Sequence, residues 1–323
     1  MRWSKTSGRA SFRKKRSVRP SESIATMVTW QELVVEATEE LANAGVPDPE
    51  ISAGYIAQRA TGTDGADWQL ITAEAATTRH LAAFDAMLAR RRTGEPLQYV
   101  IGRWAFRTLD LYLDRRVLIP RPETEIVAES ALDEIRRLSE QRGGETDVVV
   151  VDLGTGSGAI GLALATEHEL SAVWLTDVSA DALAVARANL AGTGRAGARV
   201  RVAEGPWFEA LPVHLKGRVD VVVSNPPYVG RDDEVDPQVA WEPPAALFAA
   251  DTNADVPATE HIEHLIDNAP GWLMDDGSLV VEMAPAQVGT MVERAGRRFA
   301  RVERIKDLTG RWRGIVARSP VRS

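Results

Sequence analysis

A short apolar segment followed by a glycine-rich turn constrains the fold of this 323-residue chain more than any other feature. Five of the six residues in Val148–Leu153 are apolar, as expected of a parallel strand that is buried on both faces. The turn Gly154–Gly158 carries three glycines, and Ala159–Ala165 then has the composition of a helix. This succession of strand, turn and helix predicts the start of a doubly wound α/β sheet.

Strands and helices alternate along the rest of the sequence, beginning with a helix expected over Ala180–Ala191. Further strands are predicted at Ala172–Thr176, Arg199–Ala203, Val219–Ser224, Ser278–Met283, Phe299–Ile305 and Gly314–Arg318. No long helix separates the last two strands, which is typical of an antiparallel pair. The sequence therefore predicts a doubly wound sheet of seven strands, mostly parallel, with an antiparallel finish.

The residues before the sheet are predicted to form a small helical domain over 28–94. Thr29 and Glu32 have the spacing of a capping box, which marks the start of a first helix, and Gly45 ends that helix. Two more helices are predicted at Pro49–Gly62 and Ala73–Arg92.

Residues 95–121 show an approximate alternation of apolar and polar side chains, which predicts a β-hairpin connector. Pro122 is well placed at the first turn of a helix that is expected to run to about Leu138. We therefore divide the remainder into this connector and a sheet domain over 122–323.

The charges are unevenly distributed along the chain. The formal net charge is −8, yet residues 1–20 hold eight basic side chains and no acidic one, so the remainder is strongly acidic. Three interpretations of the basic segment 1–27 stay open: a disordered arm, a presequence, or a segment outside the working protein, because Met27 opens the first helix. We expect a disordered, dispensable segment. The acidic body argues against sequence-independent binding of phosphate backbones.

Several kinds of site are disfavoured by the composition. The chain has no cysteine, which excludes disulfides, thiolate metal sites and a cysteine nucleophile. No apolar run approaches the roughly 18 residues of a membrane span. His261 and His264 have the spacing of a pair of metal ligands, but no third ligand fits that spacing, so we expect no metal site.

The glycine turn is predicted to bind an adenosine-type ligand. Asp177 ends the second strand of the sheet, where a carboxylate can accept hydrogen bonds from ribose hydroxyls. Gly154, Gly156 and Ala159 also satisfy the G-x-G-x-x-A dinucleotide pattern, so NAD remains a competing ligand. Asp152 fits S-adenosylmethionine (AdoMet) better, because that ligand carries an ammonium group in place of a pyrophosphate. A turn-capping carboxylate is the alternative interpretation of Asp152.

The strand Val219–Ser224 ends in the sequence Asn225-Pro226-Pro227-Tyr228. In a doubly wound sheet this strand lies beside the first one, so the two turns that follow them should face each other. Asn225 Oδ1 and the Pro226 carbonyl can accept both hydrogens of a planar NH₂ group, and the Tyr228 ring can stack on its π-system. This arrangement predicts methyl transfer to a planar nitrogen, against the alternative of an ordinary Asn-Pro turn.

Further motifs extend the pattern over most of the chain. They are Gly94–Tyr99, Leu118–Glu125, Asp152–Ile160, Asp177–Ser179, Trp207–Glu209, Ser224–Val229, Glu242–Pro243 and Asp307–Arg311. From about Val28 to Ala317, the chain resembles the HemK/PrmC family of peptide chain release factor glutamine N5-methyltransferases. The resemblance implies an AdoMet-dependent methyltransferase sheet, with the glutamine of the Gly-Gly-Gln motif in class 1 release factors as substrate. It also implies that the N-terminal helical domain helps to bind that partner.

The resemblance also implies roles for individual residues. The cofactor-binding set is Gly154, Thr155, Gly156, Ser157, Gly158, Asp177, Trp207 and Asn225. The substrate-binding set is Asn225, Pro226, Pro227 and Tyr228, of which Asn225, Pro226 and Tyr228 are the catalytic residues. Arg121–Glu125 would line the outer wall of the cofactor pocket. The sequence departs from the family at Pro206, where an Asp is usual, and Glu204 is a candidate replacement.

Two other functions stay open. Adenine presents the same planar NH₂ group, so adenine-N6 methylation of DNA or RNA is an alternative. NAD-dependent oxidoreduction, or nucleotide binding without catalysis, is a third. We expect a cytoplasmic monomer that binds a release factor but neither nucleic acid nor a membrane.

Overall fold

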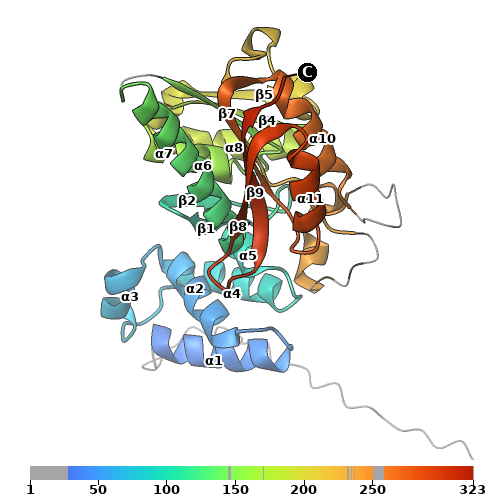
Figure 1. Ribbon diagram of the computed structural model, residues 1–323. Helices are drawn as coiled ribbons and strands as arrows, with labels where there is room; N and C mark the ends of the chain where they lie inside the picture. The colour runs from blue at the N-terminus through green and yellow to red at the C-terminus, as the bar shows by residue number, and fades with distance from the viewer. Residues whose placement is uncertain are drawn as a thin grey trace, which may run out of the picture.

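The computed structural model describes residues 28–144, 147–169, 171–230, 233, 235, 237–249 and 258–322. The predictions for the basic segment 1–27 lie outside these residues. Figure 1 shows the N-terminal helices grouped at one end of the molecule and the sheet with its covering helices at the other. Within the described ranges, none of the helices combines the length and apolar character that crossing a membrane requires.

The N-terminal part consists of short helices. They are α1 (Trp30–Asn43), α2 (Pro49–Thr61), α3 (Gly65–Ile71), α4 (Thr78–Arg91) and α5 (Leu97–Ile101). The predicted capping box is confirmed: the Glu32 N–H donates to Thr29 Oγ1 at 3.3 Å, and the Thr29 N–H donates to Glu32 Oε2 at 2.9 Å. The Trp30 ring packs edge-on against Trp68 and Phe84, with ring centroids 6.1 and 5.8 Å apart. These rings form the centre of a separate apolar core.

Two predictions in this region are wrong in detail. The helix expected over Ala73–Arg92 begins only at Thr78, because the Thr77 side chain accepts a hydrogen bond from the His80 N–H and caps the helix there. The connector 95–121 contains a hairpin only over β1 (Arg103–Phe106) and β2 (Leu109–Tyr112). Its first residues form α5, which ends at Gly102 in the left-handed conformation (φ 69°) that glycine adopts readily.

The predicted seven-stranded sheet is confirmed. Its strands are β3 (Val148–Leu153), β4 (Ser171–Asp177), β5 (Val200–Glu204), β6 (Val219–Ser224), β7 (Leu273–Glu282), β8 (Phe299–Lys306) and β9 (Trp312–Pro320). Their order across the sheet is β5-β4-β3-β6-β7-β9-β8. Within this sheet, the strands from β3 to β7 run parallel, whereas β9 pairs antiparallel with both β7 and β8. The strand β7 begins at Leu273 and not at the predicted Ser278. The prediction missed its first residues because Asp275 and Asp276 interrupt the apolar pattern.

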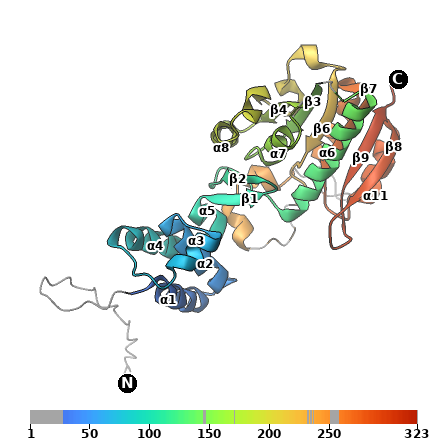
Figure 2. The same cartoon turned by 90° about the vertical axis from the view of Figure 1, so that its left-hand side faces the viewer.

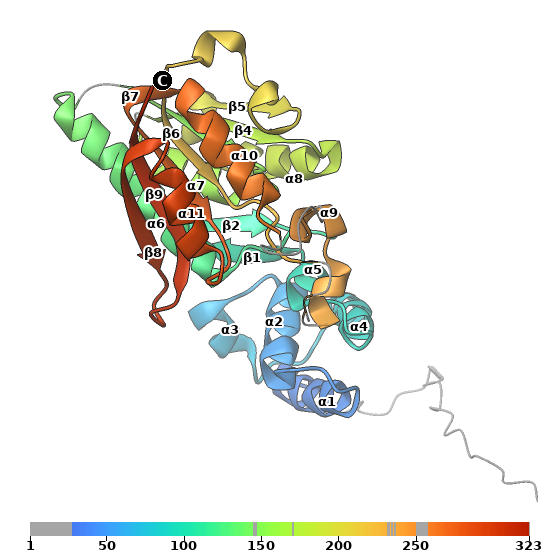
Figure 3. The same ribbon diagram turned by 45° about the vertical axis from the view of Figure 1, so that its right-hand side comes forward.

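Helices cover both faces of the sheet. They are α6 (Pro122–Gln141), α7 (Ala159–Glu167), α8 (Ala180–Ala191), α10 (Glu260–Asn268) and α11 (Val288–Ala295). The helices α6 and α7 lie on one face (Figure 2), where α8 joins them in one apolar core. The helices α10 and α11 pack on the opposite face (Figure 3), with a second core beneath them. A further short helix, α9 (Pro244–Leu247), lies outside these two layers (Figure 3).

The carboxyl ends of β3 and β6 lie side by side, as predicted for the switch point of a doubly wound sheet. Leu153 and Ser224 are register partners, and the Ser224 hydroxyl donates to the Leu153 carbonyl at 2.7 Å. The glycine turn and the Asn225 turn therefore begin directly after two neighbouring residues that are hydrogen-bonded to each other.

Candidate active site

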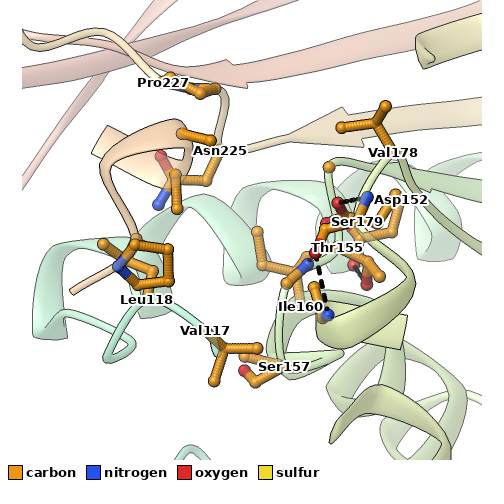
Figure 4. Close-up of a pocket in the computed structure, with 18 of the residues that line it drawn as sticks. Val117, Leu118, Asp152, Thr155, Ser157, Ile160, Val178, Ser179, Asn225 and Pro227 are labelled. Carbon is orange, nitrogen blue, oxygen red and sulfur yellow. Dashed lines mark hydrogen bonds between the residues drawn. The ribbon is translucent and has the colours of Figure 1, made fainter. Parts of the chain in front are cut away.

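A cavity of about 340 Å³ opens where the two turns meet. Asn225 and Pro227 approach it from one side, and Val178 and Ser179 from the other (Figure 4). Its lining includes most of the predicted cofactor residues, namely Gly154, Thr155, Gly156, Ser157, Asp177, Trp207 and Asn225. Three predicted site residues, Gly158, Pro226 and Tyr228, are not among the described residues that line it.

The glycine turn is shaped by the Asp152 carboxylate. Asp152 Oδ2 accepts hydrogen bonds from the Thr155 hydroxyl at 2.6 Å and the Gly161 N–H at 2.9 Å. Gly154 and Gly156 have φ values of 71° and 56°, a conformation that side-chain-bearing residues rarely adopt. Asp152 Oδ1 is buried and has no hydrogen-bond partner within the described part of the chain. Burial raises the pKa of Asp152 to about 6.

Asp177 holds the same turn from the second strand. Its Oδ2 accepts the Gly156 N–H and its Oδ1 accepts the Ser179 N–H, both at 2.9 Å. Burial raises the pKa of Asp177, and the same backbone hydrogen bonds oppose that rise. The carboxylate lines the cavity, where a sugar hydroxyl can reach it.

The chain that follows β5 forms the aromatic wall of the cavity. The backbone of Trp207 has φ 42°, and its ring lies against Gly154, where a Cβ would stand 3.5 Å from Cζ3. The His261 ring lies 5.2 Å from the Trp207 ring, centroid to centroid, and also lines the cavity. Glu204, the candidate replacement for the missing acid at Pro206, is exposed and is not among the described lining residues.

The Asn225 turn is held by residues from distant parts of the chain. Asn225 Nδ2 donates to Thr124 Oγ1 at 3.2 Å, and the Tyr228 hydroxyl donates to Glu282 Oε1 at 2.9 Å. Gln287 Nε2 donates to the Tyr228 carbonyl at 3.1 Å. Burial and the nearby Glu282 carboxyl raise the pKa of Tyr228, so its hydroxyl keeps its proton.

The outer wall joins two segments far apart in the sequence. Arg121 forms an ion pair with the buried carboxylate of Glu242, which also accepts the Ile119 N–H at 3.3 Å. The Arg115 guanidinium lies 4.4 Å from the centroid of the Trp241 ring. Of the predicted outer-wall segment Arg121–Glu125, Thr124 lines the cavity.

Sequence reasoning missed three residues at or near the cavity: Asn189, His261 and Glu282. Asn189 Nδ2 donates to the Ser157 carbonyl at 2.8 Å and the Tyr112 carbonyl at 3.1 Å, which ties the glycine turn to the hairpin. Its position on the buried face of the predicted helix Ala180–Ala191 is the signal that was available, because buried amides need partners. The other two give no local signal.

The cavity fits AdoMet. Its volume lies in the range that small-molecule sites show. The unpartnered Asp152 Oδ1 and the Asp177 carboxylate supply acceptors for a ligand that carries positive charge and ribose hydroxyls. Among the residues described, no cluster of His, Asp and Glu side chains could hold a metal ion.

Comparison with known proteins identifies the family. Residues 32–102 match the PrmC N-terminal domain, and residues 135–245 match the methyltransferase small domain. The chain is 35% identical over 298 residues to the release factor glutamine methyltransferase of Bifidobacterium longum, covering 88% of this chain and 98% of that one. It is 36% identical over 301 residues to the protein of the same name from Mycolicibacterium smegmatis, covering 92% and 100%.

A weaker likeness is found among solved structures. The N-terminal domain of human METTL16 in complex with SAH matches with a TM-score of 0.47 at 14% identity, covering 87% of this chain and 94% of that one. The sequence matches over nearly full length are much closer, and they confirm the resemblance that the motifs indicated. The chain belongs to the release factor glutamine methyltransferase family.

Proposed function

We propose that the protein transfers a methyl group from AdoMet to the side-chain amide nitrogen (N5) of the glutamine in the Gly-Gly-Gln motif of class 1 release factors. One observation carries the proposal: Asn225 lies on the wall of the same cavity as the glycine turn and the carboxylates of Asp152 and Asp177. An acceptor for an NH₂ group and a pocket for a positively charged methyl donor are therefore side by side. The names of the relatives over nearly the full chain support the same reaction.

The chain contributes binding and orientation. AdoMet supplies an electrophilic methyl group on its sulfonium. Gly154, Thr155, Gly156, Ser157 and Gly158 would hold its aminoacyl end, with Asp177 at the ribose, Trp207 at the adenine and Asn225 near the methyl group. The fixed glycine turn and the two carboxylates provide this binding without a metal ion.

The Asn225 turn would bind the glutamine amide. Asn225 Oδ1 and the Pro226 carbonyl accept its two N–H groups, and Pro227 and the Tyr228 ring confine its plane. As the nitrogen gains positive charge, both oxygens stabilise that charge more strongly, so they favour the transition state over the bound substrate. An amide nitrogen has no proton blocking its lone pair, so no general base is required before attack. The bond from nitrogen to the methyl carbon forms as the sulfonium–methyl bond breaks, which leaves S-adenosylhomocysteine as a neutral thioether. One N–H proton then leaves the methylated nitrogen, which restores the neutral amide.

We further propose a division of labour along the chain. The helical domain 28–94 and the connector 95–121 bind the release factor, and the domain 122–323 carries out methyl transfer. Support comes from the separate family match over residues 32–102. We place the enzyme in the cytoplasm, because release factors act in translation, and we expect a monomer.

A methylation assay tests the proposal. The full chain is incubated with methyl-labelled AdoMet and a class 1 release factor, and the modified residue is mapped by mass spectrometry. The matched control is the same release factor with Ala in place of the glutamine of the Gly-Gly-Gln motif. We expect label on the wild-type glutamine only. Label on adenine in added DNA or RNA, with none on the release factor, would establish the alternative function instead.

A further inference from the structure

Two buried polar side chains, to which the proposed reaction gives no role, lie behind the Asn225 turn. Thr124 lies in the first turn of α6, and Glu282 is the last residue of β7. The Thr124 side chain is 3% exposed and that of Glu282 is 1% exposed. Residues this deeply buried and this polar require partners, and both find them in the Asn225 turn.

The Thr124 hydroxyl contacts the side chain of Asn225. Its oxygen accepts a hydrogen bond from Asn225 Nδ2 at 3.2 Å. The Glu282 carboxyl does not share in this contact, because its Oε2 is buried and has no hydrogen-bond partner among the described residues.

This arrangement fixes the two ends of the Asn225 amide. The amino end faces Thr124, so the carbonyl end, Oδ1, is the one left over. No described residue donates a hydrogen bond to Oδ1, and Asn225 lines the cavity. The reversed amide would place two donors, Nδ2 and the substrate NH₂, against each other.

Glu282 holds the other end of the turn. Its Oε1 accepts the Tyr228 hydroxyl at 2.9 Å. Glu123 and Arg313 are the nearby charged groups, and Arg313 is itself paired with Glu123 at 3.0 Å and Asp307 at 2.8 Å. Glu282 therefore holds the Tyr228 end of the turn, and Thr124 holds the Asn225 end.

We infer that Thr124 is a positioning residue that makes Asn225 present its oxygen to the substrate and so selects an NH₂ group. The inference rests on the proposed function, because it assigns the origin of that site's preference for an amide nitrogen. The reacting atoms are touched by Asn225, whereas Thr124 acts through it.

The test compares Thr124→Val with Thr124→Ser in the full chain. Valine keeps the shape of threonine but cannot hydrogen-bond, whereas serine keeps the hydroxyl. We expect Thr124→Val to lower kcat for the release factor by about 10- to 100-fold, since mispositioning a substrate-binding group costs about that much. Thr124→Ser should stay within about threefold of wild type, and both variants should bind AdoMet within about threefold of wild type by calorimetry.

The outcomes separate the inference from the proposed function. Wild type that fails to methylate the release factor contradicts the proposed function, whatever the variants do. Active wild type with an equally active Thr124→Val, or with a Thr124→Ser as impaired as Thr124→Val, contradicts the inference alone.

A second measurement needs no activity. The Asn225 side-chain NH₂ signal is assigned in ¹⁵N-labelled protein by its loss in Asn225→Asp. We expect slowed hydrogen exchange of this group in wild type and in Thr124→Ser, and faster exchange in Thr124→Val. Exchange that is the same in all three folded proteins would show that Thr124 does not hold the amide, and would overturn the inference.

Discussion

The two turns that form the cavity are held in opposite ways. The glycine turn is fixed by carboxylates close to it in sequence or on the next strand, Asp152 and Asp177, which accept its own backbone and hydroxyl hydrogens. The Asn225 turn is fixed by side chains about 50 to 100 positions away, namely Thr124, Glu282 and Gln287. One turn is a local structure, and the other depends on the whole sheet domain.

The difference matches what each turn has to do. A cofactor pocket needs a backbone curve of fixed shape, which glycines and a nearby carboxylate can build alone. A substrate-orienting turn needs one particular side-chain orientation, which only packing and hydrogen bonds from other elements can impose. We therefore expect damage to the first turn to affect stability and cofactor binding together, and damage to the second to affect methyl transfer more than cofactor binding.

Asn225→Ala should have the largest effect on methyl transfer. It also separates the two turns most clearly, because it should leave AdoMet binding largely unchanged. Removing the acceptor should lower kcat for the release factor by about 100- to 1,000-fold, the usual cost of losing one oriented group at a developing charge. AdoMet binding, measured by calorimetry, should be largely retained, because the glycine turn does not depend on Asn225. Substantial methyl transfer by the variant would contradict the proposed geometry.

Gly161→Ala tests the glycine turn. A Cβ at this position would stand 2.2 Å from Leu175 Cδ2 and 3.0 Å from Asp152 Oδ2, so either the buried Leu175 side chain or the start of the helix must move. We expect a loss of about 1–3 kcal/mol in the free energy of unfolding by urea, together with weaker AdoMet binding. Gly289→Ala is the control, because nothing lies within 4 Å of its Cβ and alanine favours the helix α11. Equal stability of the two variants would show that the turn tolerates the shift.

The same contrast explains what the sequence could predict. Apolar segments located the seven strands, and the end of the second strand located Asp177, because these signals are local. The hydrogen bond from the Gly156 N–H to Asp177 was not predicted. The start of α4 at Thr78 was missed, because a threonine cap overrode the apolar pattern that precedes it. Thr124 was predicted only as part of the outer wall of the pocket. Its contact with Asn225, and the contact of Glu282 with Tyr228, could not be found, because they exist only once α6 and β7 are brought to the same strand end. The roles of the site residues remain predictions for the experiments above.

The pH dependence of stability tests the buried Glu282 carboxyl, which accepts the Tyr228 hydroxyl behind the Asn225 turn. Burial raises the pKa of Glu282 to about 7, with Glu123 opposing its ionisation and Arg313 favouring it. A raised pKa means that the folded protein binds more protons than the unfolded one between about pH 4.5 and 7, so stability falls as the pH rises through that window.

Glu282→Gln should remove that part of the pH dependence. Glutamine cannot ionise, so the variant should gain stability relative to wild type between pH 5 and pH 8, by at most about 3 kcal/mol. Urea unfolding of both proteins at the two pH values measures the difference. A stability difference that does not change with pH would mean that Glu282 titrates normally or not at all in this range.

His261→Ala gives the smallest expected effect and tests a part of the cofactor wall that lies far from the glycine turn in the sequence. The imidazole comes from α10, which follows the glycine turn by about 100 residues in the sequence. It nevertheless packs on the Trp207 ring, which in turn lies against Gly154. Burial lowers the pKa of His261, so the ring is neutral at pH 7 and acts by packing. Losing this aromatic contact should weaken AdoMet binding by about threefold to tenfold. The exposed His214 gives the matched control in His214→Ala, which should bind AdoMet as wild type does. Unchanged affinity in His261→Ala would show that the Trp207 wall, like the glycine turn, is held locally.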